Sequence, residues 1–129
     1  MKTTTSSIII AIIIIASSVF IAGRNNNNSP SENINNVSEI NGEQIITINA
    51  KGGYFPRTTI AKAEIATILK ITTKGTFDCS SAINIPSLNY RANLPASGET
   101  IINISPQKTG TTITGLCAMG MYNFSVNFN

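Results

Sequence analysis

The chain has 129 residues, enough for one modest domain, and a formal net charge of +3 from nine basic and six acidic residues. It contains no histidine, so it lacks the commonest general base and metal ligand, and an ordinary Ser-His or Cys-His hydrolase is not expected. The basic residues neither cluster nor interleave with aromatic ones, so nucleic-acid binding is not expected either.

The chain opens with an apolar stretch, residues 8–22, that carries no charge and is flanked by Lys2 and Arg24. This layout predicts a hydrophobic helix within residues 1–23 that serves as a signal peptide or as a membrane anchor. Its length is at the short end of the ~20 apolar residues that a transmembrane helix needs. Cleavage after Ala22 would leave Phe20 where a small residue belongs, which slightly favours the uncleaved anchor. Both alternatives predict an extracytoplasmic protein, membrane-anchored or secreted.

Residues 24–42 are rich in Asn and Ser, with few apolar side chains. Such a segment buries too little apolar surface to offset the entropy of ordering, so we predict a flexible linker. The folded domain is then expected to begin at residue 43 and to extend to residue 129.

The folded region is expected to be all-β, with six to eight short strands separated by turns. Gly52, Gly53 and Pro56 predict a turn after the first strand, and residues 75–81 are expected to form a loop. Strands at intervals of ~8–12 residues are typical of a β-sandwich or barrel. The expected strands are 43–50, two pieces within 58–74 that are separated by a kink near Ala63–Glu64, 83–89, 98–106, 111–116 and 122–128.

The last of these strands has the cleanest alternation in the chain. Large apolar residues alternate with Asn and Ser, which predicts one face on the core and one face in water. The residues expected to be buried are Tyr122, Phe124, Val126 and Phe128, and those between them are expected to be exposed.

Sulfur is concentrated just before that strand, in the segment "GLCAMGMYNF". Cys117, Met119 and Met121 occupy alternate positions there, and the second cysteine of the chain, Cys79, lies beside an expected strand. A sandwich can bring two such loops together at one pole. Thiolates and thioethers are soft ligands that favour Cu(I), whereas a blue Cu(II) centre needs imidazoles that this chain does not contain.

Four phrases of the sequence carry a resemblance to a known family: "GGYFP", "FDCSSAINIPSLN", "SPQKTGT" and "CAMGM". From about residue 43 to the end, the chain resembles a cupredoxin-like domain, the fold of small blue copper proteins. The resemblance is best to a variant subgroup without the histidine ligands. It implies a Greek-key β-sandwich. The sequence departs from the pattern at Glu64, where similar members often have Gly in a turn.

The resemblance also implies a ligand set. Cys79 matches the position of the usual mid-chain histidine, Cys117 matches the thiolate ligand, and Met121 matches the axial methionine. Met119 stands where a second histidine would be sought. Asp78 is expected either to tune a bound metal or to be a loop carboxylate that is solvated or accepts a hydrogen bond.

Two functional hypotheses follow, and neither is an enzyme. The first is a domain that binds a soft metal, most simply Cu(I), for copper handling or delivery, with a copper transporter or another membrane protein as partner. The second is a metal-free sandwich held by a Cys79–Cys117 disulfide that acts as an interaction or adhesion module, with Met119 and Met121 filling gaps in the core. The sequence leaves both open, because the same two sulfurs serve either role.

Overall fold

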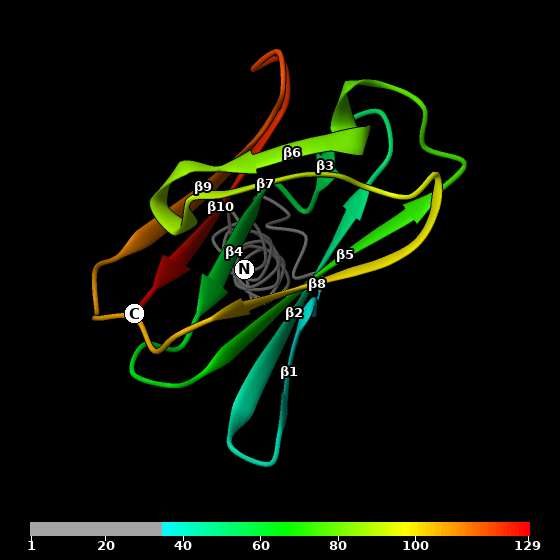
Figure 1. Ribbon diagram of the computed structural model, residues 1–129. Coiled ribbons are helices and arrows are strands. Elements are labelled where there is room, and N and C mark those ends of the chain that lie inside the picture. The colour runs from blue at the N-terminus through cyan, green and yellow to red at the C-terminus, as the bar shows by residue number, and fades with distance from the viewer. Residues whose placement is uncertain (1–34) are drawn as a thin grey trace, which may run out of the picture. The chain divides into compact units, whose positions relative to one another are not determined.

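A computed structural model describes residues 35–129, and these residues form two β-sheets that pack face to face (Figure 1). Two short 3₁₀-helices, η1 and η2, interrupt the strands. The elements are β1 (Val37–Ile40), β2 (Glu43–Ala50), β3 (Tyr54–Phe55), β4 (Thr58–Ala61), β5 (Thr67–Lys74), η1 (Cys79–Ser81), β6 (Ala82–Ile85), η2 (Pro86–Leu88), β7 (Tyr90–Asn93), β8 (Ser97–Ile104), β9 (Thr112–Cys117) and β10 (Asn123–Phe128).

The strand order is β1-β2-β5-β8 in one sheet, with β3 also paired to β2, and β4-β10-β9-β6-β7 in the other. Two pairs are parallel, β2 with β5 and β4 with β10, and the other pairs are antiparallel. The expected all-β sandwich is therefore confirmed. Across residues 35–129 no helix is long and apolar enough to span a membrane, and the apolar segment 8–22 lies outside the described residues.

The alternation predicted for the last strand is confirmed in β10. Phe124, Val126 and Phe128 are fully buried, whereas Tyr122, which precedes the strand, is only partly buried. Asn123 is exposed as expected, but the outward-facing residues farther along β10 are half-buried. This difference arises because β10 is an interior strand that pairs with β4 on one side and with β9 on the other.

Phe124 occupies the centre of the core next to a residue without a side chain. Its partner across the β9–β10 ladder is Gly115. A Cβ atom at Gly115 would lie 2.2 Å from Cε1 of Phe124, so the aromatic ring covers the glycine directly. The ring also packs edge-on against Tyr54, with centroids 5.2 Å apart.

The folded domain begins earlier than predicted. Residues 37–40, which lie within the predicted linker, form β1 and pair with the start of β2. The connecting residues Asn41 and Gly42 both have positive φ, 53° and 81°. Asn-Gly is the strongest short-range hairpin signal because both residues tolerate this conformation. The segment is rich in Asn and Ser, which favoured a linker, so the hairpin was not predicted. The remainder of the predicted linker, up to residue 34, lies outside the described residues.

The predicted kink near Ala63–Glu64 is confirmed, but it does more than bend a strand. It separates β4 from β5, which belong to different sheets. Glu64 has a φ of +63°, in the left-handed region that favours glycine. Gln44 stabilises the crossover between the sheets. Its fully buried side-chain amide donates to the carbonyl of Lys62 and accepts a hydrogen bond from the N–H of Lys62.

Candidate functional site

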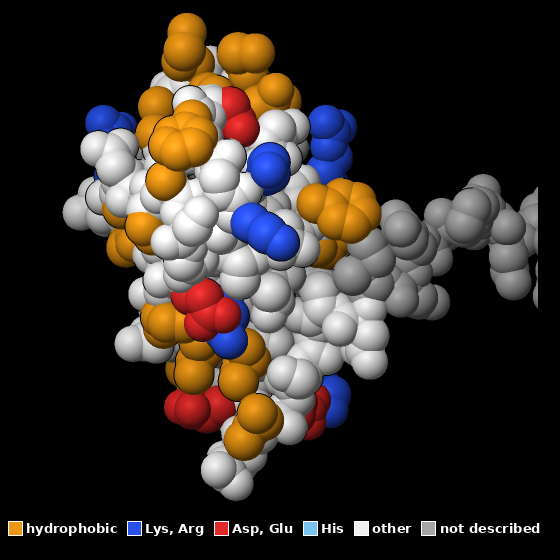
Figure 2. Space-filling view, turned by 90° about the vertical axis from the view of Figure 1, so that its right-hand side faces the viewer, with side chains coloured by type: hydrophobic (Ala, Val, Ile, Leu, Met, Phe, Trp, Pro, Cys, Tyr) orange, Lys and Arg blue, Asp and Glu red, His pale blue; other side chains and the backbone are white. Residues whose placement is uncertain are grey.

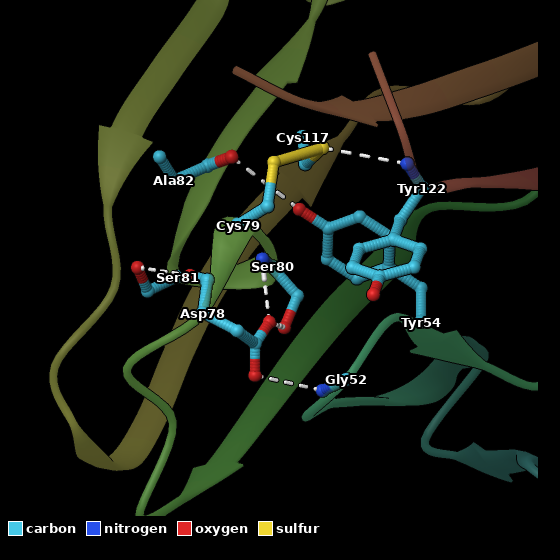
Figure 3. Close-up of a disulfide and its surroundings, with 9 residues drawn as sticks. All are labelled: Gly52, Tyr54, Asp78, Cys79, Ser80, Ser81, Ala82, Cys117 and Tyr122. Carbon is cyan, nitrogen blue, oxygen red and sulfur yellow. Dashed lines mark hydrogen bonds between the residues drawn. A yellow bond between two sulfur atoms is a disulfide. The ribbon is translucent and has the colours of Figure 1, made fainter. Parts of the chain in front are cut away.

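Three loops meet at one end of the sandwich: residues 51–53, 75–81 and 118–122 (Figures 1 and 3). There Cys79 and Cys117 form a disulfide, and their Cα atoms are 5.7 Å apart. The prediction that the two cysteines face each other at one pole is therefore confirmed. In this structure both sulfurs are consumed by the bond between them.

The loop before β6 holds Cys79 through a network centred on Asp78. The Asp78 carboxylate caps η1 by accepting hydrogen bonds from the backbone N–H and the hydroxyl of Ser80. It also accepts the N–H of Gly52 at 2.8 Å, which ties the β2–β3 loop to the cysteine loop. The Ser80 hydroxyl, followed by the Gly52 and Ser80 N–H groups, lowers the pKa of Asp78. Asp78 is thus an exposed, ionised loop carboxylate that accepts hydrogen bonds.

Cys117 ends β9 and begins the tight loop that leads into β10. Its N–H donates to the carbonyl of Tyr122 at 2.9 Å, and the N–H of Tyr122 donates to its Sγ at 3.4 Å. The N–H of Gly120 closes the loop by donating to the carbonyl of Cys117, and Gly120 has a φ of +71° that suits glycine. These bonds fix the position of the Cys117 sulfur (Figure 3).

The two methionines of this loop point away from the core. Met119 is 79 % exposed and Met121 is 65 % exposed, so neither fills a gap in the interior. The core-filling interpretation of these residues is therefore wrong. The reason is the turn around Gly120, which lifts the intervening residues off both strands. The two thioethers are left available to a ligand.

Sequence reasoning missed Phe77, which is 84 % exposed and lies two residues before Cys79. Phe77, Met119 and Met121 are all exposed, and each lies within four residues of a cysteine of the disulfide in the sequence. Hydrophobic side chains gather at this end of the domain, at the top of Figure 2. The sequence feature that could have identified Phe77 is an aromatic residue in a loop, between Gly75 and Asp78, where it cannot belong to the core face of a strand.

Tyr54, which Figure 3 draws next to the disulfide, is 2 % exposed. Its hydroxyl donates to the carbonyl of Ala82 at 3.4 Å (Figure 3). Burial, with a smaller contribution from the negative charge of Asp78, raises the pKa of Tyr54 to about 12. A neutral phenol that resists ionisation thus lies next to the site.

This raised pKa predicts a loss of stability at high pH. The unfolded tyrosine loses its proton near pH 10, before the folded one does, so the free energy of unfolding falls between about pH 10 and pH 12. A shift of two pKa units corresponds to a loss on the order of 2–3 kcal/mol. Urea unfolding at several pH values should show a shallower decline for Tyr54→Phe than for the wild type. Identical declines would contradict this assignment.

The donor set at this pole is made of sulfur. Among residues 35–129 there is no group of three or more His, Cys, Asp or Glu side chains that could hold a metal ion. Soft donors remain: two cysteine sulfurs, once the disulfide is reduced, and two exposed thioethers within four residues of Cys117. Such a set fits a soft monovalent ion rather than a hard divalent one.

The chain matches no protein-family model and no curated protein sequence. Its fold, however, is similar to that of solved structures. One is a copper-binding protein in the apo form, with 25 % identity, a TM-score of 0.65, and coverage of 72 % of this chain and 94 % of that chain. Another is the metal-binding domain of the Cu(I)-exporting P-type ATPase CopA of Streptococcus pneumoniae D39, with Cu(I). That domain has 23 % identity and a TM-score of 0.63, and the match covers 72 % and 92 % of the two chains. The described residues have a cupredoxin-like fold.

Proposed function

We propose that the reduced form of this domain binds one Cu(I) ion through Cys79 and Cys117 and serves copper handling or delivery. The observation that carries the proposal is the meeting of the two cysteines, 5.7 Å apart at Cα, beside a loop that exposes two thioethers. Met121 is the proposed third ligand, and Met119 is an additional, weaker one. The similarity in fold to a copper-binding protein and to a metal-binding domain solved with Cu(I) supports the same assignment.

The ligand chemistry explains why the ion is Cu(I). Thiolates and thioethers are polarisable donors that suit a soft cation, whereas the blue Cu(II) centre needs two imidazoles that this chain cannot supply. Copper and the disulfide compete for the same sulfurs. Oxidation is therefore expected to block binding, and reduction is expected to permit it.

The cellular location of the domain is part of the proposal. The apolar segment 8–22 supports an extracytoplasmic domain that is anchored or secreted, and a disulfide suits such an oxidising compartment. A copper transporter or another membrane protein is the proposed partner. No enzymatic activity is part of this proposal.

A competition titration tests the proposal. Reduced protein is titrated with a Cu(I) chelator of known affinity in the absence of oxygen, and one equivalent of Cu(I) is expected to transfer to the wild type. Replacement of both cysteines by serine should abolish uptake, because a hydroxyl is a poor ligand for Cu(I). Met121→Leu should weaken binding, and Met119→Leu should weaken it less. Both Leu variants should melt close to the wild type, because the side chains are exposed.

Equal copper uptake by the wild type and by the double cysteine variant would refute the proposal. The disulfide itself favours a second function, a metal-free interaction module stapled by Cys79–Cys117. That alternative predicts no specific uptake of Cu(I) by the reduced protein, so the same titration decides between the two.

A further inference from the structure

The two cysteines of the disulfide differ in their exposure to solvent. Cys117 is 2 % exposed and belongs to the core, whereas Cys79 is only partly buried. Cys79 begins the surface turn η1 and follows two exposed residues, Phe77 and Asp78. Cys79 is therefore the more accessible of the two cysteines to a reagent that approaches the bond from solvent.

The two sulfurs also differ in their hydrogen bonding. The Cys117 Sγ accepts the backbone N–H of Tyr122 at 3.4 Å. A fixed N–H donor stabilises negative charge that develops on the atom it faces, as in other preorganised sites. Cleavage of the S–S bond is thus assisted when the electron pair departs on Cys117. The greater exposure of Cys79 and the N–H donor at Cys117 therefore favour the same reaction, in which Cys79 is attacked and Cys117 is the leaving group.

We propose that Cys79 is a thiol-exchange site, at which an external thiol opens the disulfide through a mixed-disulfide intermediate. The sulfur of a donor thiolate attacks Sγ of Cys79 and forms a new S–S bond. The Cys79–Cys117 bond breaks, and its electron pair leaves on Cys117 as a thiolate. A second donor thiolate then attacks the donor sulfur of the mixed disulfide and releases the Cys79 thiolate.

The exchange is balanced in atoms and electrons. Two donor thiols are oxidised to one disulfide, the protein disulfide is reduced to two thiols, and two electrons are transferred. The reaction requires no metal, and it applies whether or not the domain binds copper. The attacking group is defined here by its chemistry, a thiol, which either a small molecule or a protein dithiol can supply.

Single-cysteine variants provide the first test. Cys117→Ser retains the accessible thiol and Cys79→Ser retains the buried one, so the two form a matched pair. Each is incubated without metal in oxidised glutathione, and the mixed disulfide is followed by intact mass. We expect Cys117→Ser to form the adduct at least tenfold faster. Equal rates, or a faster reaction of Cys79→Ser, would overturn the proposal. Thermal melting verifies that both variants are folded, and alanine variants replace either one that is not.

The wild-type disulfide provides the second test and needs no substitution. It is treated with reduced glutathione, quenched early with an alkylating agent and digested with trypsin, which places Cys79 in peptide 75–91 and Cys117 in peptide 109–129. The glutathionyl group is expected on 75–91 and the alkyl group on 109–129. The reverse, an even distribution, or no exchange with any thiol would overturn the proposal.

A parallel reaction identifies the source of the thiol. It uses a thioredoxin-type dithiol protein whose resolving cysteine has been replaced, so that a covalent complex through Cys79 is retained. Faster reaction in this arm assigns the site to protein dithiols, and faster reaction with glutathione assigns it to small thiols. A complex linked through Cys117 would overturn the proposal in the same way as the peptide map.

Discussion

Phe124→Asp is expected to unfold the domain. The ring of Phe124 is fully buried, covers Gly115 across the ladder and packs edge-on against Tyr54. Loss of a buried Phe typically costs 3–5 kcal/mol, and an unpaired carboxylate in the core adds a desolvation cost of several kcal/mol. A domain of this size is stable by only about 5–15 kcal/mol, so the two terms together remove most or all of the free energy of unfolding.

Circular dichroism and thermal melting measure this effect. The matched control is Asn123→Asp, one position away on the same strand, where the side chain is exposed and the change is nearly isosteric. The control should melt within a few degrees of the wild type. A cooperative transition of Phe124→Asp near the wild-type temperature would show that the core is not organised around this residue.

Reduction of the Cys79–Cys117 disulfide is expected to lower the free energy of unfolding by roughly 3–4 kcal/mol. The bond closes a loop between residues 38 positions apart, and such a cross-link restricts the unfolded chain by about this amount. For a domain of this size the melting temperature should fall by on the order of 15–25 °C. The measurement is a thermal melt with and without a phosphine reductant, in the presence of a copper chelator.

The control for this experiment is the double variant with alanine at positions 79 and 117, whose melting temperature the reductant should not change. If the reduced protein also binds Cu(I), added Cu(I) should recover part of the lost stability, because a ligand that binds only the folded state stabilises it. Equal melting temperatures for the oxidised and reduced wild type would show that the disulfide contributes little to the fold.

The sequence predicted best those elements whose signal is local. The alternation of apolar and polar residues predicted β10, and β2 was predicted with the bounds that the structure shows. It did not predict β1 or β7, because each is a four-residue edge strand that depends on its partner. The assignment of β4 and β5 to different sheets was also not predictable, because a kink in a sequence does not reveal which sheet each piece joins.

The site shows the same division. The expected loops, together with the topology that the cupredoxin-like resemblance implies, were enough to place Cys79 and Cys117 together. They were not enough to decide between a disulfide and a metal site, since both need the same proximity. The exposure of Met119 and Met121 depends on the turn at Gly120, and periodicity does not register such a turn. The hydrogen bond that the N–H of Gly52 donates to the Asp78 carboxylate joins loops that are distant in sequence, and no local pattern encodes it.

The parallel pairing of β4 with β10 has a consequence for biosynthesis. β4 lies at the edge of its sheet, with β10 as its neighbour, so it has no ladder to join until β5 to β9 and then β10 have been made. Such non-local pairing slows folding, because the intervening chain must be closed before the contacts form. The core side chains of β10 arrive just as late. The domain therefore completes its fold only after residue 128 has left the ribosome, because the sheet that contains β4 cannot close before β10 is available.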